Sequence, residues 1–289
     1  MKRREVLVIL THYETPQIEG LIARARRQLD GRADVFVSAF VDMPEGTAPI
    51  FEKYPFAIPF TRSDFAALGY PRKFHEDGWK MIPGNADLIV MAFWKRYPGY
   101  THYWVMEGDV DYTGKLDELF AAFDASVADL LCTNIRPQPR NWQHRARFYC
   151  PTGWNEAEEN RVIAFLPFFR VSQRFLRTLD AFYRDGGAGH HEKTWPFAAL
   201  ARGLVIEDLG SRGPFTAAHN RGRYYTSCHI GTLMYPGTFR YRPVMNRPGK
   251  RPDMLWHPVK DDVDLPRELL RVLRRRLRRL FRRLTGAGA

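Results

Sequence analysis

The chain has few cysteines and no long apolar run. Its three cysteines, Cys132, Cys150 and Cys228, form no C-x-x-C pair, and their odd number argues against a disulfide framework. We therefore expect free, buried thiols. No apolar stretch reaches the length of a membrane span, and residues 6–10 are too few for the apolar core of a secretory signal. We expect residues 6–10 to lie in the first strand of a cytoplasmic protein.

Three well-known nucleotide- or metal-binding motifs are also missing. The chain has no G-x-G-x-x-G, which argues against a dinucleotide-binding fold of that kind. It has no G-x-x-x-x-G-K-[ST], which argues against P-loop kinases and sulfotransferases. An H-E-x-x-H motif starting at His191 would need a second histidine where the chain has Trp195, so this type of zinc-protease site is excluded.

What is present is a pattern of strands and helices within a chain of 289 residues that is 45% hydrophobic. Residues 5–10 and 34–40 read as strands, and residues 18–29 read as a helix with one apolar face. This β-α-β opening predicts an α/β fold with a mostly parallel sheet and helices on its faces. We predict further strands over 101–107, 129–133, 161–165 and 204–207. Further helices are predicted over 85–97, 116–126 and 172–184, the last capped by Ser172, with a short one starting near Pro196.

Positive charge is concentrated at the end of the chain. Of the net charge of +12, residues 265–289 carry +8, because they hold nine arginines and one acid, Glu268. The other 264 residues therefore carry only +4, so the charge does not indicate a basic catalytic face.

The tail also has an apolar stripe that recurs at steps of three and four residues: Leu269, Leu270, Leu273, Leu277, Leu280, Phe281 and Leu284. A basic amphipathic helix over 265–285 is suited to an anionic membrane surface. The alternative is a helix packed on the body of the protein with a solvated arginine face. We expect no nucleic-acid partner, because the stripe needs an apolar surface that phosphates do not supply.

The most informative segment is residues 101–111, where a strand-like run meets a cluster of acids. Its aromatic and β-branched residues predict a buried strand that Gly108 ends. Asp109 and Asp111 are two apart, and in an extended chain such side chains point to one side, where they suit Mg²⁺ or Mn²⁺ carrying a diphosphate. The alternative is a turn in which Asp109 bonds nearby amides. Glu107 and Asp109 are also two apart, so either pair fits.

Two later segments supply further candidates. His257 follows an apolar run, and its imidazole can complete a Mn²⁺ site. Lys260 comes three residues later and can bind a phosphate as a point charge. The alternative is a packed histidine and a surface lysine. Glu192 follows a glycine-rich loop and is placed to deprotonate a sugar hydroxyl, or else to cap a helix.

The loop after the first strand is a fourth candidate. Thr11, His12 and Tyr13 would contact the base or ribose of a nucleotide there, with Tyr13 stacking on it. Asp42, after the second strand, fits the same role or that of a turn residue.

Two blocks of sequence resemble the GT-A type of glycosyltransferase, of the small bacterial and fungal kind with a D-x-D arrangement. They are Tyr103-Trp104-Val105-Met106-Glu107-Gly108-Asp109-Val110-Asp111-Tyr112-Thr113-Gly114 and Trp256-His257-Pro258-Val259-Lys260. The resemblance covers residues 4–260. It implies a GT-A-like mixed sheet in one domain over 1–260, with a donor-binding half over 1–133 and an acceptor half over 134–260.

The resemblance also implies a nucleotide-sugar donor, Mn²⁺ or Mg²⁺, and a hydroxyl acceptor. Asp109 and Asp111 match the metal-binding acids, His257 matches a late histidine on metal or diphosphate, and Glu192 matches the base of inverting members. Some relatives lack an acid at the place of Asp111 and keep one at the place of Glu107.

We therefore expect a cytoplasmic glycosyltransferase, peripheral on the inner face of the membrane, that acts on a glycan or lipid-linked acceptor in cell-envelope synthesis. One alternative is a sugar nucleotidyltransferase, although the glycine- and lysine-rich loop common in those enzymes is missing after the first strand. Another is a non-catalytic, membrane-associated scaffold with the same fold.

Overall fold

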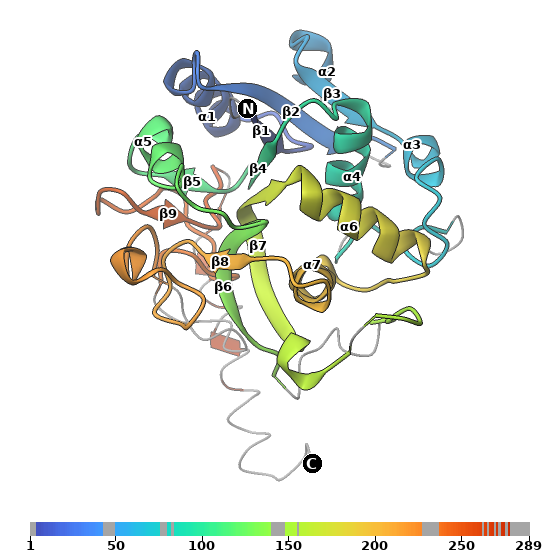
Figure 1. Ribbon diagram of the computed structural model, residues 1–289. Coiled ribbons are helices and arrows are strands. Elements are labelled where there is room, and N and C mark those ends of the chain that lie inside the picture. Colours follow the sequence, from blue (N-terminus) through green and yellow to red (C-terminus); the bar gives the residue numbers. More distant parts are fainter. Residues whose placement is uncertain are drawn as a thin grey trace.

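In the described part of the chain, a mixed sheet of seven strands forms the centre of the fold (Figure 1). The computed structural model describes residues 4–42, 50–75, 80–81, 84–139, 148–154, 156–226, 237–261, 263–264, 266–268, 270, 273–274 and 277. The strand order is β3-β2-β1-β4-β7-β6-β8. The strands are β1 (Glu5–Leu10), β2 (Ala33–Phe40), β3 (Ala57–Phe60), β4 (His102–Glu107), β6 (Leu130–Pro137), β7 (Val162–Ser172) and β8 (Ile206–Asp208).

The strand directions match the α/β fold class predicted from the sequence. β3, β2, β1 and β4 are parallel neighbours, β7 runs antiparallel to both β4 and β6, and β8 is parallel to β6. The mixed, mostly parallel sheet is therefore confirmed. A separate pair of short strands, β5 (Asp111–Tyr112) and β9 (Leu255–Trp256), lies outside the main sheet.

Helices cover both faces of the sheet, as strands with apolar side chains on both faces require. Val6 and Val8 of β1 belong to one core cluster, and Leu7 and Ile9 belong to the other. The first cluster packs against α4 (Asp87–Arg96), α6 (Gln173–Arg184) and α7 (His191–Ala201), and the second against α1 (Pro16–Gln28) and α5 (Leu116–Ala121) (Figure 1). Short elements complete the fold: α2 (Ile50–Lys53), α3 (Arg62–Ala66), η2 (Glu158–Asn160) and η3 (Ala218–Asn220).

Two predicted elements differ from the structure in a way that matters for the site. β7 is buried throughout and extends to Ser172, well beyond the predicted end of the strand at residue 165. Ser172 then caps α6 by accepting a hydrogen bond from the amide of Phe175, as predicted. The helix predicted to start near Pro196 starts at His191 instead. Proline inside a helix removes one backbone hydrogen bond, and burial of Trp195 and Phe197 on either side offsets that loss.

The cysteines and the tail are described only in part. Cys132 is buried and Cys150 is half-buried, and both are free thiols, whereas Cys228 lies outside the described residues. Within the predicted helix over 265–285, residues 266–268, 270, 273, 274 and 277 are helical, and the rest of that prediction lies outside the described residues. No helix in the described ranges is both long and apolar enough to cross a bilayer.

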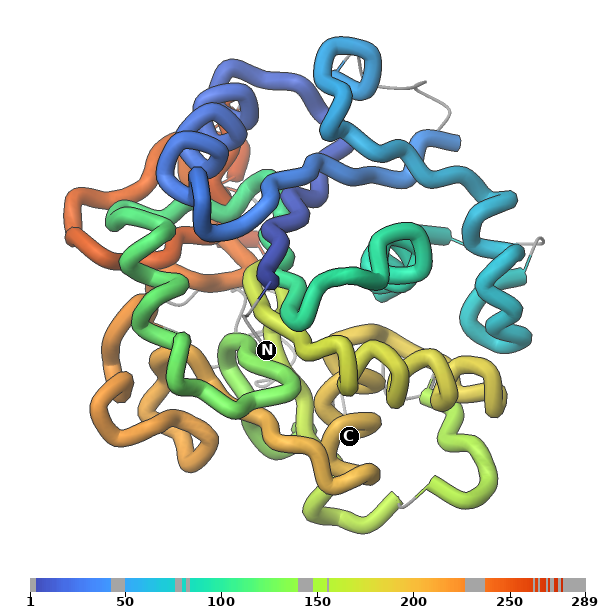
Figure 2. The backbone as a smooth tube through the Cα atoms, turned by 45° about the horizontal axis from the view of Figure 1, so that its top comes forward, coloured from blue at the N-terminus to red at the C-terminus, as the bar shows by residue number. Residues whose placement is uncertain are grey.

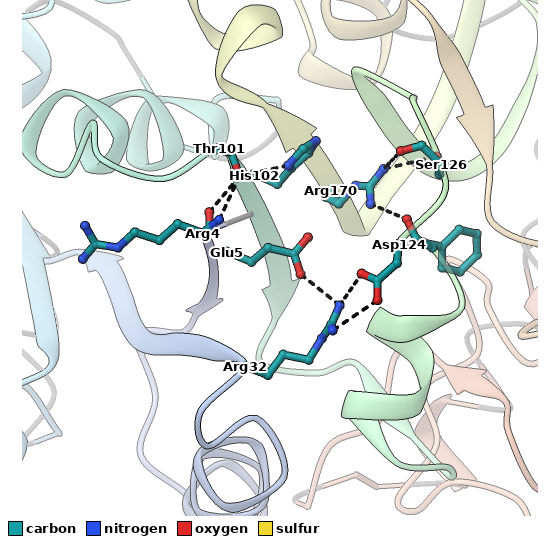
Figure 3. A network of polar contacts seen from close by, with 9 residues as sticks. Arg4, Glu5, Arg32, Thr101, His102, Asp124, Ser126 and Arg170 are labelled. Atoms are coloured by element: carbon teal, nitrogen blue, oxygen red, sulfur yellow. Dashed lines mark hydrogen bonds and ion pairs between the residues drawn. The ribbon is translucent and has the colours of Figure 1, made fainter. Parts of the chain in front are cut away.

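A polar network joins the edge of α5 to the main sheet (Figure 3). Arg32 lies 3.2 Å from the Glu5 carboxylate at the start of β1 and 2.6 Å from Asp124. On β7, the fully buried Arg170 donates to the carbonyl oxygens of Phe123, at 2.9 Å, and Ser126, at 3.2 Å. Both arginines therefore fix the turn after α5 against the sheet.

We expect Arg170→Met to lower the free energy of unfolding by about 2–4 kcal/mol, because the carbonyl oxygens of Phe123 and Ser126 lose their charged donor. Urea unfolding should show a lower midpoint with an unchanged slope. The matched control is Arg177→Met, on the exposed face of α6, which should stay within about 0.5 kcal/mol of the wild type. Equal stability of the two variants would mean that the buried contacts of Arg170 contribute nothing.

Candidate functional site

The candidate site lies past the carboxyl ends of three neighbouring parallel strands. In the sheet register, Leu10 at the end of β1 is paired with Ser38 on β2 and with Glu107 at the end of β4. A cavity of about 660 Å³ opens beyond these ends. Its wall includes seven of the ten residues singled out from the sequence: Thr11, His12, Tyr13, Asp42, Glu107, Asp109 and Lys260.

Gly108 allows the end of β4 to approach the end of β1. Its amide donates to the carbonyl oxygen of Leu10 at 2.8 Å. A Cβ atom at this position would lie 2.9 Å from the Cβ of Thr11, closer than real side chains come. The chain then turns, because the amide of Val110 bonds back to the carbonyl oxygen of Glu107 at 2.9 Å. The acidic motif is therefore a tight turn after the strand, not a continuation of it.

Three potential metal ligands meet at this turn. The Nε2 atom of His257 lies 3.4 Å from Asp109 Oδ1 and 3.6 Å from Glu107 Oε2. One ligand atom from each of the three residues falls within 4.8 Å of the others. The ammonium of Lys260 lies 3.2 Å from the second oxygen of Asp109. The cluster thus offers two carboxylates at the cavity wall, with a buried imidazole behind them and a cation beside them.

Strand pairing brings His257 to the acids from far along the sequence. β9 is antiparallel to β5, with Trp256 opposite Asp111, so the residues after β9 run back alongside the turn before β5. The amide of Val259 then donates to the carbonyl oxygen of Asp109 at 2.8 Å. Figure 2 shows the red segment that contains β9 lying beside the green segment that contains β5.

The orientation of His257 suits a metal ligand. Its Nδ1 donates to the carbonyl oxygen of Arg240 at 2.7 Å, which leaves Nε2 facing the two carboxylates. A metal-bound histidine commonly fixes its second ring nitrogen in this way. The rings of Phe165 and Phe239 pack against the imidazole at centroid distances of 5.2 and 5.4 Å.

The charges in the cluster stabilise one another. Burial disfavours the charged imidazole, but the carboxylates of Asp109 and Glu107 outweigh this effect and raise the pKa of His257 to about 9. Burial also opposes the charged form of Asp109, yet the positive charges of His257 and Lys260 hold its pKa below the usual value. Positive charge beside the carboxylates therefore stabilises their ionised forms.

Asp111 does not join this cluster. Its carboxylate forms an ion pair with Arg24 of α1 and accepts a hydrogen bond from the amide of Tyr112 at 2.7 Å. The two-residue spacing predicted a shared direction only for an extended chain, and the turn at Gly108 breaks that condition. The structure thus groups Glu107 with Asp109, which is the other pair that the sequence allowed.

Glu192 lies in the first turn of α7, where the imidazole of His190 accepts a hydrogen bond from the Glu192 amide at 3.3 Å. Its side chain is one-fifth exposed. Burial raises the pKa of Glu192 to about 8, and the negative charge of Glu107 adds to this shift while Arg136 and His257 oppose it. Glu192 is therefore close enough to the cluster to feel its charges, although the cavity wall does not include it.

The loop after β1, residues 11–13, is held by hydrogen bonds within itself. The Thr11 hydroxyl donates to the carbonyl oxygen of Tyr13 and accepts a hydrogen bond from the Tyr13 amide, each at 3.1 Å. The Tyr13 ring is 56% exposed and lies against His12. Asp42 accepts a hydrogen bond from the amide of Arg62, at the start of α3.

Some residues of the site carry no signal that the sequence reveals. The side-chain amide of Gln17 donates to the carbonyl oxygen of Val259 at 3.0 Å, and the backbone amide of Gln17 donates to the Asp261 carboxylate at 2.8 Å. These two bonds hold the late segment against α1. Lys80 and Met81 form part of the cavity wall from a loop before α4. The partner of His257 is a backbone carbonyl, which no side-chain pattern can show.

No protein-family model and no curated protein matches the sequence. Among solved structures, the apo form of mouse xyloside xylosyltransferase 1 is 12% identical, with 71% of this chain and 85% of that chain covered and a TM-score of 0.39. A proposed glucose-1-phosphate thymidylyltransferase from Bacillus anthracis is 8% identical, with coverage of 71% and 86% and a TM-score of 0.38. The inositol-1-phosphate CTP transferase of T. maritima is 9% identical, with coverage of 71% and 84% and a TM-score of 0.37. All three are named as transferases, but likeness at this level carries no argument about what this chain does.

Proposed function

We propose that this protein is a metal-dependent glycosyltransferase that moves a sugar from a nucleoside-diphosphate donor to a hydroxyl acceptor. The observation that carries the proposal is the cluster of Glu107, Asp109 and His257, whose two carboxylates lie at the wall of the cavity past β1 and β4. Ligands of open α/β sheets bind at this edge, and a cavity of about 660 Å³ matches the size of small-molecule sites.

The residues of the cluster fit a divalent cation. Carboxylate oxygens suit Mg²⁺ and Mn²⁺, and imidazole is also a ligand for transition metals, which favours Mn²⁺ of the two. Glu107, Asp109 and the Nε2 atom of His257, after it gives up its proton, would hold the ion. When bound, it would neutralise charge on the departing diphosphate. Lys260, beside Asp109, is placed to bind a phosphate oxygen, and the loop of Thr11, His12 and Tyr13 is placed to contact the nucleoside.

Glu192 is the proposed base on the acceptor side. An acceptor hydroxyl oxygen attacks the anomeric carbon, and its proton passes to the Glu192 carboxylate. The bond between the anomeric carbon and the diphosphate oxygen breaks as the new glycosidic bond forms, and the nucleoside diphosphate leaves with the bonding electrons. A single displacement of this kind would invert the configuration at the anomeric carbon.

We further propose that the enzyme is peripheral on the inner face of the membrane, where a lipid-linked acceptor would lie. In support, Leu270, Leu273 and Leu277 are 45, 51 and 58% exposed at the described helical positions of the tail. Glu268 ties the start of this helix to the body through Arg242, at 2.8 Å. Exposed leucines beside arginines suit an anionic interface.

Asp109→Asn should abolish Mn²⁺-dependent nucleotide release and weaken Mn²⁺ binding at least tenfold, because it removes a charged ligand; loss of even an outer partner costs about 10- to 100-fold. Asp111→Asn is the matched variant and should keep Mn²⁺ affinity within about threefold. A screen of nucleotide-sugar donors for nucleotide release, with Mn²⁺ binding followed by electron paramagnetic resonance, measures both. Release that survives in the folded Asp109 variant would contradict the proposed site. Release of pyrophosphate from a nucleoside triphosphate would indicate a nucleotidyltransferase instead.

Glu192→Gln should lower kcat by about 10²- to 10⁴-fold, the usual contribution of a general base, while the KM of the donor stays near the wild-type value. Gln keeps the size of the side chain but accepts no proton. Steady-state kinetics on the identified donor measures the split. A variant that keeps kcat would remove Glu192 from the chemistry and leave the metal site standing.

Flotation with vesicles that contain anionic lipid should carry the intact chain upward. The triple variant Leu270→Ser, Leu273→Ser and Leu277→Ser should bind at least about tenfold more weakly, because each leucine gives up apolar burial in the interface. A chain cut before residue 265 should lose the interaction. Val127→Ser is the control, since Val127 is 79% exposed and lies outside the tail. Equal flotation of the intact chain and the triple variant would count against membrane docking.

A further inference from the structure

A fully buried ammonium lies between two segments that border the site. The side chain of Lys73 is 1% exposed. Its Nζ donates to the carbonyl oxygen of Gly84 at 2.9 Å and to that of Gly189 at 2.8 Å, and it lies 3.0 Å from the Asp87 carboxylate. Three acceptors thus surround a group that carries three N–H donors.

The two carbonyl groups belong to different parts of the site. Gly84 lies in the loop that contributes Lys80 and Met81 to the cavity wall. Gly189 precedes His190, the N-cap residue of α7, and α7 carries Glu192. Lys73 therefore bonds at the same time to the loop that forms part of the cavity wall and to the segment that presents the proposed base.

The two segments also contact each other directly. The amide of His191 donates to the carbonyl oxygen of Gly84 at 3.1 Å. A Cβ atom on Gly84 would lie 2.8 Å from the ring of His190, so only glycine permits this approach. The loop and the start of α7 are packed closely, and Lys73 bonds to both of them. We call this contact between the Gly84 loop and the start of α7 the junction.

A buried ammonium is a costly way to join two segments. Taking it out of water is energetically unfavourable, and a packed apolar side chain in its place is often neutral or stabilising. Burial lowers the pKa of Lys73, which the carboxylate of Asp87 opposes. What an apolar side chain cannot supply is a donor that bonds to both carbonyl oxygens at fixed distances.

We infer that Lys73 is a positioning residue, which holds the wall of the donor cavity in register with the helix that carries Glu192. Its effect on turnover rests on the proposed function, whereas its effect on the junction does not. Misplacement by about 1 Å can cost about 100-fold in rate, so a loosened junction should reach the chemistry.

Asp87→Asn supplies a matched control. Asp87 accepts hydrogen bonds from the hydroxyl of Tyr183 and from Trp195 Nε1, the latter at 3.2 Å. Asparagine can keep an oxygen acceptor there, and the variant leaves both bonds from Lys73 to the carbonyl groups. It therefore weakens the buried ion pair without releasing the junction.

The experiment compares Lys73→Met with Asp87→Asn by hydrogen exchange, Mn²⁺ binding and kcat. In Lys73→Met, the amides of Asn85 and His191 should exchange at least about tenfold faster, and kcat should fall about 10- to 100-fold. Mn²⁺ affinity should be unchanged, because the ligands lie on β4 and after β9. Asp87→Asn should lower Tm while kcat stays within about threefold of the wild type.

Several results would overturn the inference. They are unchanged exchange at His191 in Lys73→Met, unchanged kcat in that variant, or an equal loss of kcat in Asp87→Asn. If Lys73→Met alone does not fold, the double variant Lys73→Met with Asp87→Asn removes both charges, and its comparison with Asp87→Asn measures the same two quantities. A wild-type chain that releases no nucleotide would contradict the proposed function. The hydrogen exchange rates of Asn85 and His191 would still decide whether Lys73 holds the junction.

Discussion

The central constraint at the site is electrostatic: two carboxylates lie close together at the end of β4, and they require positive charge beside them. Glu107 and Asp109 are held on a tight turn, with the Asp109 side chain mostly buried, and neighbouring acids of this kind repel each other unless a cation lies between or beside them. In the protein alone, His257 and Lys260 supply that charge. A divalent cation carrying a diphosphate would satisfy the same need, because the three ligand atoms already converge and the imidazole already presents Nε2.

The fold brings this arrangement together from separated parts of the chain. β1 and β4 end at the cavity, the end of β4 and the turn after it carry the two acids, and the pairing of β9 with β5 brings the late segment beside them. Gln17 of α1 then holds that segment by two hydrogen bonds. On the other side, Lys73 joins the cavity wall to the start of α7. Each part of the proposed reaction thus depends on a different segment of the chain.

Local patterns predicted the parts of the fold that local physics determines. The β-α-β opening follows from apolar periodicity, and the cap of α6 follows from a serine before an apolar helix face. The acidic motif and the first loop could be placed at the site because parallel strands deliver their carboxyl ends to one edge. Asp109 and the residues Thr11 to Tyr13 meet at one cavity for this reason.

The direction of Asp111 and the start of α7 could not be predicted in the same way. Asp111 turns to Arg24 because Gly108 lets the chain bend, and its spacing from Asp109 contains no information about that bend. α7 runs through Pro196 because burial of its neighbours outweighs one lost hydrogen bond. Lys73 and its two carbonyl partners are joined only by tertiary contacts, and so is the carbonyl of Arg240 that orients His257.

The most direct test of the account is the position of Mn²⁺ in crystals grown with a nucleoside diphosphate, located by anomalous scattering. The account predicts one strong peak within coordination distance of the Glu107 and Asp109 carboxylates and His257 Nε2, with the diphosphate beside Lys260. A peak bound by Asp111 and not by Glu107, or a nucleotide held in the cavity with the cation elsewhere, would contradict it.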